Sequence, residues 1–358
     1  MGQITPSVGG LCIPTTAEAY EYFGKNTPIG RENDGTALLQ FLKSNINMRG
    51  LRDLSEDIIG VPGKTRGVRI WHRTPFCFSV CASPFNCLET PTPFTPPISV
   101  FEYEIESRYT PCDGAGNPME LYMDSTEYAL YCSLEDATEF NNRILDFDTK
   151  LVKEFNKTLV NLLFANVTNA PVTYPIITNN TLTGQRVIND ELLVWLHELV
   201  STAKMNLEDY VIFGGQMVNL LKLKYNKKTM SSEGAEYVVD GLPAMYYERN
   251  FDAVFGTNAL LLLPIGAFQL VQWKQYVGSK MFKDERTILM NKTIQLGNGA
   301  TQDIDFVWEY DPKCSKYKYF PSLYAELVKA IPGNCVDANQ DGIFIVKDCN
   351  TSIIPTCA

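Results

Sequence analysis

Catalytic residue patterns are scarce in this sequence. Histidine occurs twice among the 358 residues, as His72 and His197, and neither lies in an H-E-x-x-H or H-x-E pattern. The sequence also lacks the G-x-x-x-x-G-K-[ST] loop, the G-x-G-x-x-G turn and the G-x-S-x-G elbow. Because each of these motifs places the atoms that its chemistry needs, their absence excludes P-loop, dinucleotide-binding and serine-hydrolase sites of the usual kind. The sequence predicts a protein that is not an enzyme.

Positive charge and long apolar runs are also missing. The formal net charge is -10, with 31 basic and 41 acidic residues, and no run of Lys and Arg stands out. A chain without a basic patch has no electrostatic footprint for nucleic acid, so if it lies near DNA it encloses the DNA rather than gripping it. No apolar run reaches the roughly 18 residues of a membrane span, and the N-terminus has no basic start followed by an apolar core. The sequence therefore predicts neither a membrane segment nor a secretory signal.

Cysteine, by contrast, is abundant, with ten residues in the chain. Cys77, Cys81 and Cys87 cluster with the spacing C-x3-C-x5-C, which lacks the paired C-x2-C units of most zinc sites. We interpret them as small apolar residues of a β-rich segment.

One short stretch has the shape of an anion site. Gly214 and Gly215 join the strand-like "DYVIF" to the helical "QMVNLLK", and a helix N-terminus after glycines can bind an anion. The motif is short and unspecific, and we interpret it as a strand-to-helix turn.

The C-terminal stretch "NCVDANQDGIFIVKDC" has the spacing of a calcium loop. A calcium loop needs oxygen ligands at positions one, three, five, seven and twelve, and glycine at six. The predicted ligands are the side chains of Asp337, Asn339, Asp341 and Asp348 with the carbonyl of Ile343, while Gly342 allows the turn, and Cys335 and Cys349 would brace the ends. The same residues fit a hairpin turn at Asp-Gly between apolar strands. Calcium is therefore a candidate structural ion, and no cofactor is required.

A helix of unusual length is predicted at residues 133–167. This stretch contains neither proline nor glycine, and its apolar residues recur every three or four positions. Acidic residues crowd the first turns and lysines come later, as the helix dipole favours. A coiled coil is the alternative, but the apolar set drifts from a strict heptad.

The other segments follow a fixed order around this helix. Residues 1–62 read as extended, with one amphipathic stretch at 35–46. Residues 66–132 alternate with the two-residue period of strands and are interrupted by a proline-rich loop. Residues 170–298 read as a compact α/β unit, in which "ALLLLPIGAF" indicates buried strands, and residues 301–331 read as a hairpin of long strands.

This order resembles the major capsid proteins of tailed bacteriophages, whose fold is shared with encapsulins and the herpesvirus capsid floor. The resemblance implies an α+β fold with six parts. These are an N-terminal arm at 1–65, an extended β loop that begins the peripheral domain at 66–132, a spine helix at 133–167, an axial domain at 168–299, closing strands of the peripheral domain at 300–332, and a C-terminal extension at 333–358. The ten cysteines and the extension depart from the family pattern.

The resemblance also implies a function. The chain would assemble with copies of itself, as pentamers and hexamers, into the icosahedral head shell of a virion that encloses DNA without specific binding. Portal, scaffold and decoration proteins are the further partners it implies, with assembly in the host cytoplasm. The alternative is an extracellular calcium-binding adhesion or carbohydrate-binding module, which depends on the C-terminal loop.

Overall fold

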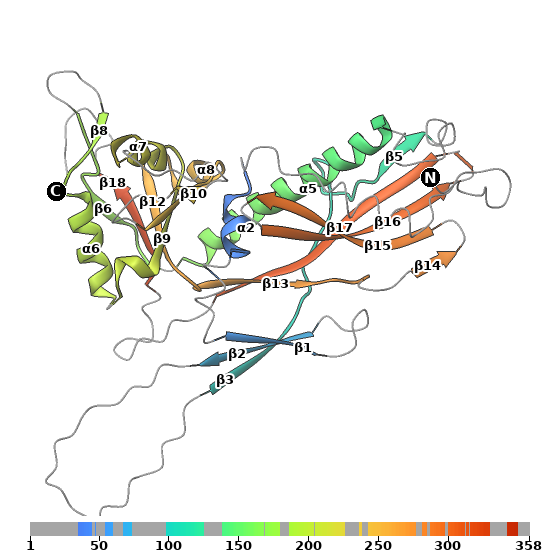
Figure 1. The fold of residues 1–358 in the computed structure, drawn as a ribbon, viewed down its shortest axis with the longest axis horizontal. Coiled ribbons are helices and arrows are strands. Elements are labelled where there is room, and N and C mark those ends of the chain that lie inside the picture. Colours follow the sequence, from blue (N-terminus) through green and yellow to red (C-terminus); the bar gives the residue numbers. More distant parts are fainter. Residues whose placement is uncertain are drawn as a thin grey trace, which may run out of the picture.

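The structure is a computed structural model. It describes residues 35–44, 47, 54–59, 67–73, 98–124, 138–167, 169–179, 186–203, 205–225, 236–237, 243–276, 281–284, 287–297, 300–311, 313–314, 316–329 and 342–349. Two large sheets are joined by one long helix, and a smaller three-stranded sheet lies apart from them (Figure 1). This mixture of helices and sheets is the α+β class that the sequence predicts.

The first large sheet has six strands. Their order is β10 (Glu236–Tyr237), β11 (Ala244–Tyr247), β9 (Tyr210–Gly214), β12 (Ala259–Pro264), β18 (Phe344–Asp348) and β6 (Val172–Tyr174). β12 runs antiparallel to both of its neighbours, whereas β11 is parallel to β9 and β18 is parallel to β6. The order of strands along the chain is therefore not their order in the sheet.

Both faces of this sheet are covered by helices, and successive residues of β12 lie in two different apolar clusters. Leu260 and Leu262 lie in an apolar cluster with helices α6 (Leu192–Thr202) and α7 (Gln216–Tyr225). Leu261 and Leu263 lie in a second cluster with helices α2 (Ala37–Leu42) and α8 (Phe251–Phe255). Successive side chains of a strand point to opposite faces, so four consecutive leucines serve two cores.

A two-stranded ribbon and a short helical turn complete this part of the chain. The ribbon pairs β7 (Ile177–Asn179) with β8 (Arg186–Ile188) in antiparallel fashion, and a 3-10 turn, η2 (Leu207–Asp209), leads into β9.

The second large sheet has seven strands. The main path is β13 (Phe268–Trp273), β17 (Lys316–Lys329), β16 (Ala300–Asp311), β15 (Thr287–Gly297) and β14 (Met281–Asp284), and the short strands β4 (Arg108–Tyr109) and β5 (Leu121–Asp124) also pair with β17. β16 and β17 form the long hairpin predicted at 301–331, with Asp305 opposite Ser322. Buried and partly exposed residues alternate along β16, as expected where one face of a sheet is covered.

The long helix is α5, Thr138–Ala165, which spans about 42 Å at 1.5 Å per residue. It runs along the seven-stranded sheet toward the six-stranded one (Figure 1). Its buried residues include Leu151, Phe155 and Leu159, which share one cluster with Leu323 of β17 and Leu261 of β12. The prediction of a single long helix is confirmed, and its apolar stripe packs within this chain. Residues 133–137 of the predicted span lie outside the described residues.

The three-stranded sheet consists of β1 (Leu54–Ile59), β2 (Gly67–Arg73) and β3 (Ile98–Glu104), all antiparallel and in continuous register. None of these described strands pairs with either large sheet. The proline-rich loop predicted between β2 and β3 lies outside the described residues.

Two predicted boundaries need correction. The axial segment was expected to extend to residue 299, but β13, β14 and β15 all precede that point and pair in the seven-stranded sheet. The chain leaves the six-stranded sheet at the Pro264–Ala267 turn, where Gly266 has φ +81° and Ala267 N–H donates to the Pro264 carbonyl at 3.1 Å. That turn therefore joins the two large sheets.

The C-terminal segment also belongs to the body. It was expected to be an extension, yet β18 is an inner strand between β12 and β6. Ile345 lies in the cluster with Leu261, whereas Val346 lies in the cluster with Leu260. Successive residues of "GIFIV" therefore contribute to both apolar clusters, so this segment is an integral part of the sheet.

Candidate functional site

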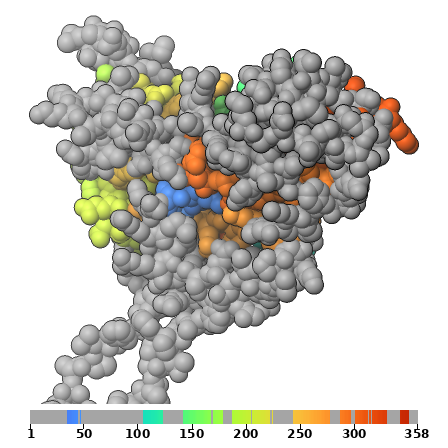
Figure 2. Space-filling model, turned by 45° about the vertical axis from the view of Figure 1, so that its right-hand side comes forward, coloured from blue at the N-terminus to red at the C-terminus, as the bar shows by residue number. Residues whose placement is uncertain are grey.

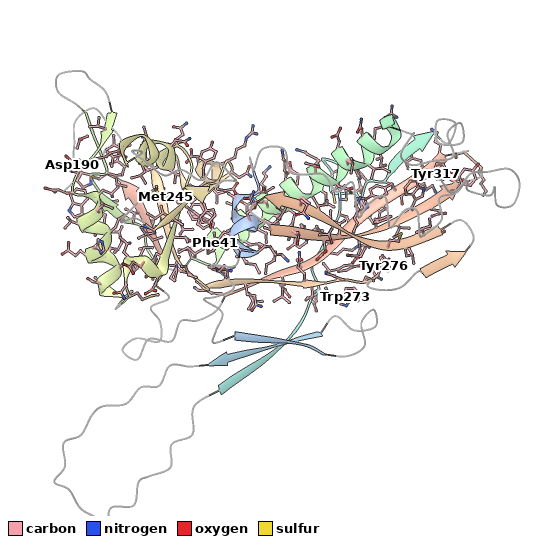
Figure 3. All side chains as sticks on the ribbon, in the orientation of Figure 1. Phe41, Asp190, Met245, Trp273, Tyr276 and Tyr317 are labelled. Carbon is pink, nitrogen blue, oxygen red and sulfur yellow. The ribbon has the colours of Figure 1, made fainter. Side chains whose placement is uncertain are left out.

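The centre of the molecule is a short helix that the sequence places in the arm. All six residues of α2 are buried, at 0–3% exposure. Figure 2 shows this segment in blue between the yellow-green part of the molecule and the orange strands, and Figure 3 places Phe41 where the two large sheets meet. The Phe41 ring meets Phe213 and Tyr246 edge-on, with centroid distances of 5.3 and 5.4 Å. The amphipathic stretch at 35–46 thus contributes to the core of its own chain.

A buried carboxylate receives the N-terminus of α2. One oxygen of Glu248, Oε2, accepts hydrogen bonds from Leu38 N at 3.2 Å and from Asn156 Nδ2 at 3.0 Å. The other, Oε1, accepts from the backbone and side-chain nitrogens of Asn250 at 3.1 and 3.2 Å. The first N–H groups of a helix have no partner within the helix, so a buried helix start needs such acceptors.

Asn156 of α5 completes this arrangement. Its Oδ1 accepts from Leu39 N at 2.9 Å while its Nδ2 donates to Glu248. One amide therefore connects α5, α2 and the segment between β11 and α8. We call Glu248, Asn156 and the N-terminal turn of α2 the polar junction.

The electrostatics of the polar junction are dominated by burial. Glu248 is 1% exposed, and burial raises the pKa of its carboxyl although four hydrogen bonds favour the ionised form. Removing any one partner would leave a buried polar group unsatisfied, which costs about 1–3 kcal/mol. The junction therefore favours one relative placement of the three segments.

A second set of bonds ties the α2 region to the seven-stranded sheet. Asn47 Nδ2 donates to the carbonyls of Leu42 and Phe268 at 3.3 and 3.1 Å, and its Oδ1 accepts from Gly266 N at 2.9 Å. Gln40 Nε2 donates to the Leu296 carbonyl at 3.1 Å. These hydrogen bonds therefore fix the α2 region to the seven-stranded sheet.

Sequence analysis missed the polar junction, although it left one signal. Asn156 lies within the apolar stripe of α5, beside Phe155 and one turn before Leu159 and Val160, where a polar side chain needs a buried partner. Nothing in the sequence names that partner, because Glu248 lies 92 positions away.

The glycine turn before α7 holds a carboxylate instead of a free anion. Asp252 Oδ2 accepts from Gln216 N at 3.0 Å. A Cβ added to Gly215 would lie 2.2 Å from the Asp252 carboxyl carbon, so glycine permits this close approach. The interpretation of the stretch as a strand-to-helix turn is confirmed.

The predicted calcium ligands are only partly within the described residues. Gly342 has φ +68°, as a sharp turn requires. The Ile343 carbonyl accepts from Asn169 Nδ2 at 2.7 Å, and Asp348 Oδ1 accepts from Ile177 N at 3.2 Å. Ile343 directly precedes β18 and Asp348 is its last residue, so the two are about 16 Å apart at the rise of an extended strand and one ion cannot use both.

The remaining residues of that loop are Asp337, Asn339, Asp341 and Cys335, which lie outside the described residues. Cys349 is disulfide-bonded. The described residues contain no group of three or more His, Cys, Asp or Glu that could hold a metal ion. Cys77, Cys81 and Cys87 also lie outside the described residues. No helix in the described part of the chain is long and apolar enough to cross a membrane.

Comparison with known proteins gives similarity at the level of structure alone. No family model matches the sequence, and no curated protein matches it. Among solved structures, the chain is similar to the capsid asymmetric unit of cyanophage A-1(L), with TM-score 0.48, 10% identity and coverage of 90% of this chain and 95% of that chain. It is also similar to a structure of Mycobacterium phage Adephagia, with TM-score 0.43, 9% identity and coverage of 95% and 99%. A third is the capsid structure of Staphylococcus phage Andhra, with TM-score 0.42, 7% identity and coverage of 82% and 81%.

Proposed function

We propose that this chain is the major capsid protein of a tailed bacteriophage, a shell subunit that assembles with copies of itself around a DNA genome. The supporting architecture is a well-packed body of two sheets joined by α5, with an extended three-stranded excursion attached to it. Strands β2 and β3 of the excursion come from the segment that the resemblance assigns to the extended loop, whereas β1 comes from the segment assigned to the N-terminal arm. α5 comes from the segment assigned to the spine helix.

The observation that carries the proposal is the residue pattern of the excursion. The register places Ile58, Val68 and Tyr103 in one row across the three strands and Glu56, Ile70 and Phe101 in the next row on the same face. On the opposite face, Asp57, Arg69 and Glu102 form a charged row, and the row beside it consists of Ser55, Trp71 and Val100. We call the face that carries Ile58, Val68, Ile70, Phe101 and Tyr103 the apolar face.

A small sheet is stabilised when its apolar residues are buried against another element. In a shell, the excursion of each subunit would pack on a neighbouring copy, and the same subunit would be contacted by the excursion of another copy. Interfaces made in this way bury far more area than a standard protein–protein contact. The same chain would occupy pentamers and hexamers, and the excursion would absorb the difference between the two environments.

The remaining parts of the proposal concern the particle. Net charge of -10 suits a wall that encloses DNA without adhering to it. The chain would belong to the virion after assembly in the host cytoplasm, with portal, scaffold and decoration proteins as partners and no enzymatic role. A calcium ion would be an accessory of the C-terminal loop. The adhesion alternative depended on that loop as a separate module, and the place of β18 inside the sheet favours a structural role instead.

Substituting aspartates for two residues of the apolar face tests the proposal. We expect the double variant Ile70→Asp and Phe101→Asp to remain a folded monomer, because neither residue lies in the two large sheets, but to lose assembly. Glu102→Gln on the opposite face is the matched control and should assemble as the unaltered chain does. Sedimentation velocity distinguishes the species. Assembly of the double variant at the unaltered yield, or an unaltered chain that stays monomeric under all assembly conditions, would contradict the proposal.

A further inference from the structure

A lysine and an aspartate are buried side by side where α5 crosses the seven-stranded sheet. Lys292 of β15 and Asp148 of α5 have side chains that are 3% and 0% exposed, and Lys292 Nζ donates to Asp148 Oδ2. Tyr319 of β17 donates its hydroxyl to the other oxygen, Asp148 Oδ1, at 2.7 Å. None of these three groups belongs to the polar junction or to the excursion.

Aromatic rings surround the lysine amine. Its Nζ lies 4.7 Å from the centre of the Tyr319 ring and 5.1 Å from the centre of the Phe306 ring. An environment with so little water disfavours separate charges. Burial raises the pKa of Asp148 and lowers the pKa of Lys292, in each case against the attraction of the partner, so burial shifts both groups toward the neutral acid and the neutral amine that condensation needs.

We propose that Lys292 and Asp148 condense into an intramolecular isopeptide bond that joins α5 to β15. The geometry brings together the three components that the reaction needs. The amine is the nucleophile, the carboxyl carbon is the electrophile, and the Tyr319 hydroxyl is a hydrogen-bond donor aimed at the oxygen that gains negative charge.

The step balances without any further reactant. The Nζ lone pair attacks Asp148 Cγ, and Tyr319 stabilises the charge that develops on Oδ1. The C–Oδ2 bond then breaks, and Oδ2 leaves as water with its own proton and one proton from Nζ. Oδ1 becomes the amide oxygen and Nζ keeps one hydrogen, so no oxidant, reductant or activating group is consumed.

The bond would have a structural consequence for a shell subunit. It would close a loop between residues 144 positions apart and prevent α5 from separating from the sheet. Closing a long loop restricts the unfolded chain, so the cross-linked protein should resist heat and force better than the same chain without the bond.

Intact mass spectrometry of the purified, reduced full chain tests the proposal. The expected mass is lower than that of the sequence by one water molecule, and tandem spectra of a tryptic digest should contain a branched peptide that joins Asp148 to Lys292. Lys292→Arg should have the full mass of its sequence, because the guanidinium does not condense. An unaltered chain with the full mass and free Lys292 would overturn the proposal, as would a water loss that the spectra place elsewhere.

A second variant keeps the test informative if Lys292→Arg folds poorly. Tyr319→Phe retains the ring and removes only the donor, so in a chain refolded from denaturant the branched peptide should form about 10²–10³-fold more slowly. Tyr317→Phe, two residues earlier on the same strand, is the matched control and should react at the unaltered rate. Equal rates for both variants would contradict the role assigned to Tyr319.

Discussion

β12 and β16 are both inner strands of large sheets, yet they are built on different residue patterns. β12 is "ALLLLP", with every residue buried, whereas β16 is "ATQDIDFVWEYD", with buried and partly exposed residues in alternation. The difference follows from the number of faces that are covered. Helices lie on both faces of the six-stranded sheet, and α5 covers the seven-stranded sheet on one face. A continuous apolar run therefore marks a strand between two cores, and alternation marks a strand with a single core.

Helices α5 and α2 pack against both large sheets and connect them. Residues of α2, α5, β12 and β17 belong to one apolar cluster, so the two sheets share a core rather than meeting at a surface. Changes in the shared core should therefore affect the whole body, whereas changes on a partly exposed strand face should not.

Breaking α5 should have the largest effect. Leu151→Pro removes a helix hydrogen bond and brings the proline ring against the preceding turn, at a cost of about 3 kcal/mol or more, in addition to the lost burial of a leucine that is 6% exposed. We expect no soluble, assembled protein. Leu151→Met is the control, since volume-conserving changes cost less than about 1.5 kcal/mol. Soluble Leu151→Pro protein with an unaltered melting curve would show that α5 is not one continuous helix.

Removing the Phe41 ring should have the next largest effect. Phe41→Ala opens a cavity between Phe213 and Tyr246, and buried Phe→Ala changes cost about 3–5 kcal/mol. Phe164→Ala on α5 is the matched control, because that ring is 43% exposed, and we expect about 1 kcal/mol or less. Chemical denaturation measures both. If the two variants lose equal stability, α2 is not part of the core of its own chain.

A pair of substitutions compares the two sheets directly. Leu261→Ala in β12 should lower the free energy of unfolding by about 2–5 kcal/mol, because the residue is fully buried in the shared core. Val307→Ala in β16 lies on the partly exposed face and should cost about 1 kcal/mol. A larger loss at Val307 would mean that the second face of the seven-stranded sheet is also covered.

The polar junction should show the smallest effect, with a dependence on pH. Glu248→Gln leaves part of the donor set unsatisfied and should cost about 1–3 kcal/mol near pH 4.5. Burial raises the pKa of Glu248 in the folded state above the usual 4.5, so the unfolded chain ionises first as the pH rises, and the folded protein loses stability through this group. Glutamine does not ionise, and the difference between the two proteins should therefore shrink as the pH rises.

Glu154→Gln is the matched control for this prediction. Glu154 faces solvent on the same helix and pairs with Lys150 at 2.7 Å, an exposed ion pair that contributes about 0.2–1 kcal/mol. Urea titrations at several pH values would compare the two variants. A stability difference for Glu248→Gln that stays constant or grows with pH would contradict the buried-carboxylate account.

Local patterns in the sequence predicted several elements. The stripe of Leu151, Phe155 and Leu159 predicted α5, and the run from Ala259 to Pro264 predicted a buried strand. Each of these signals is carried by residues close together in the chain. The turn before α7 was also predicted, because two glycines between a strand and a helix permit a close approach of backbone and side chain.

Long-range partners could not be predicted in the same way. The stretch "ALLLLPIGAF" indicated buried strands, but no local signal states that β13 pairs with β17 rather than with β12. The apolar residues around Ile345 fitted a calcium loop and a strand equally well, and the choice depends on β12 and β6 as neighbours. No local pattern marks Glu248, because its role arises from its hydrogen bonds to α2 and α5.

Single-particle electron microscopy of the purified full chain tests the central claim most directly. The account predicts closed shells in which β1, β2 and β3 of each copy lie over an adjacent copy, with the apolar face of Ile70 and Phe101 against it. Dispersed monomers under every assembly condition, or shells in which this sheet packs only on its own subunit, would contradict it.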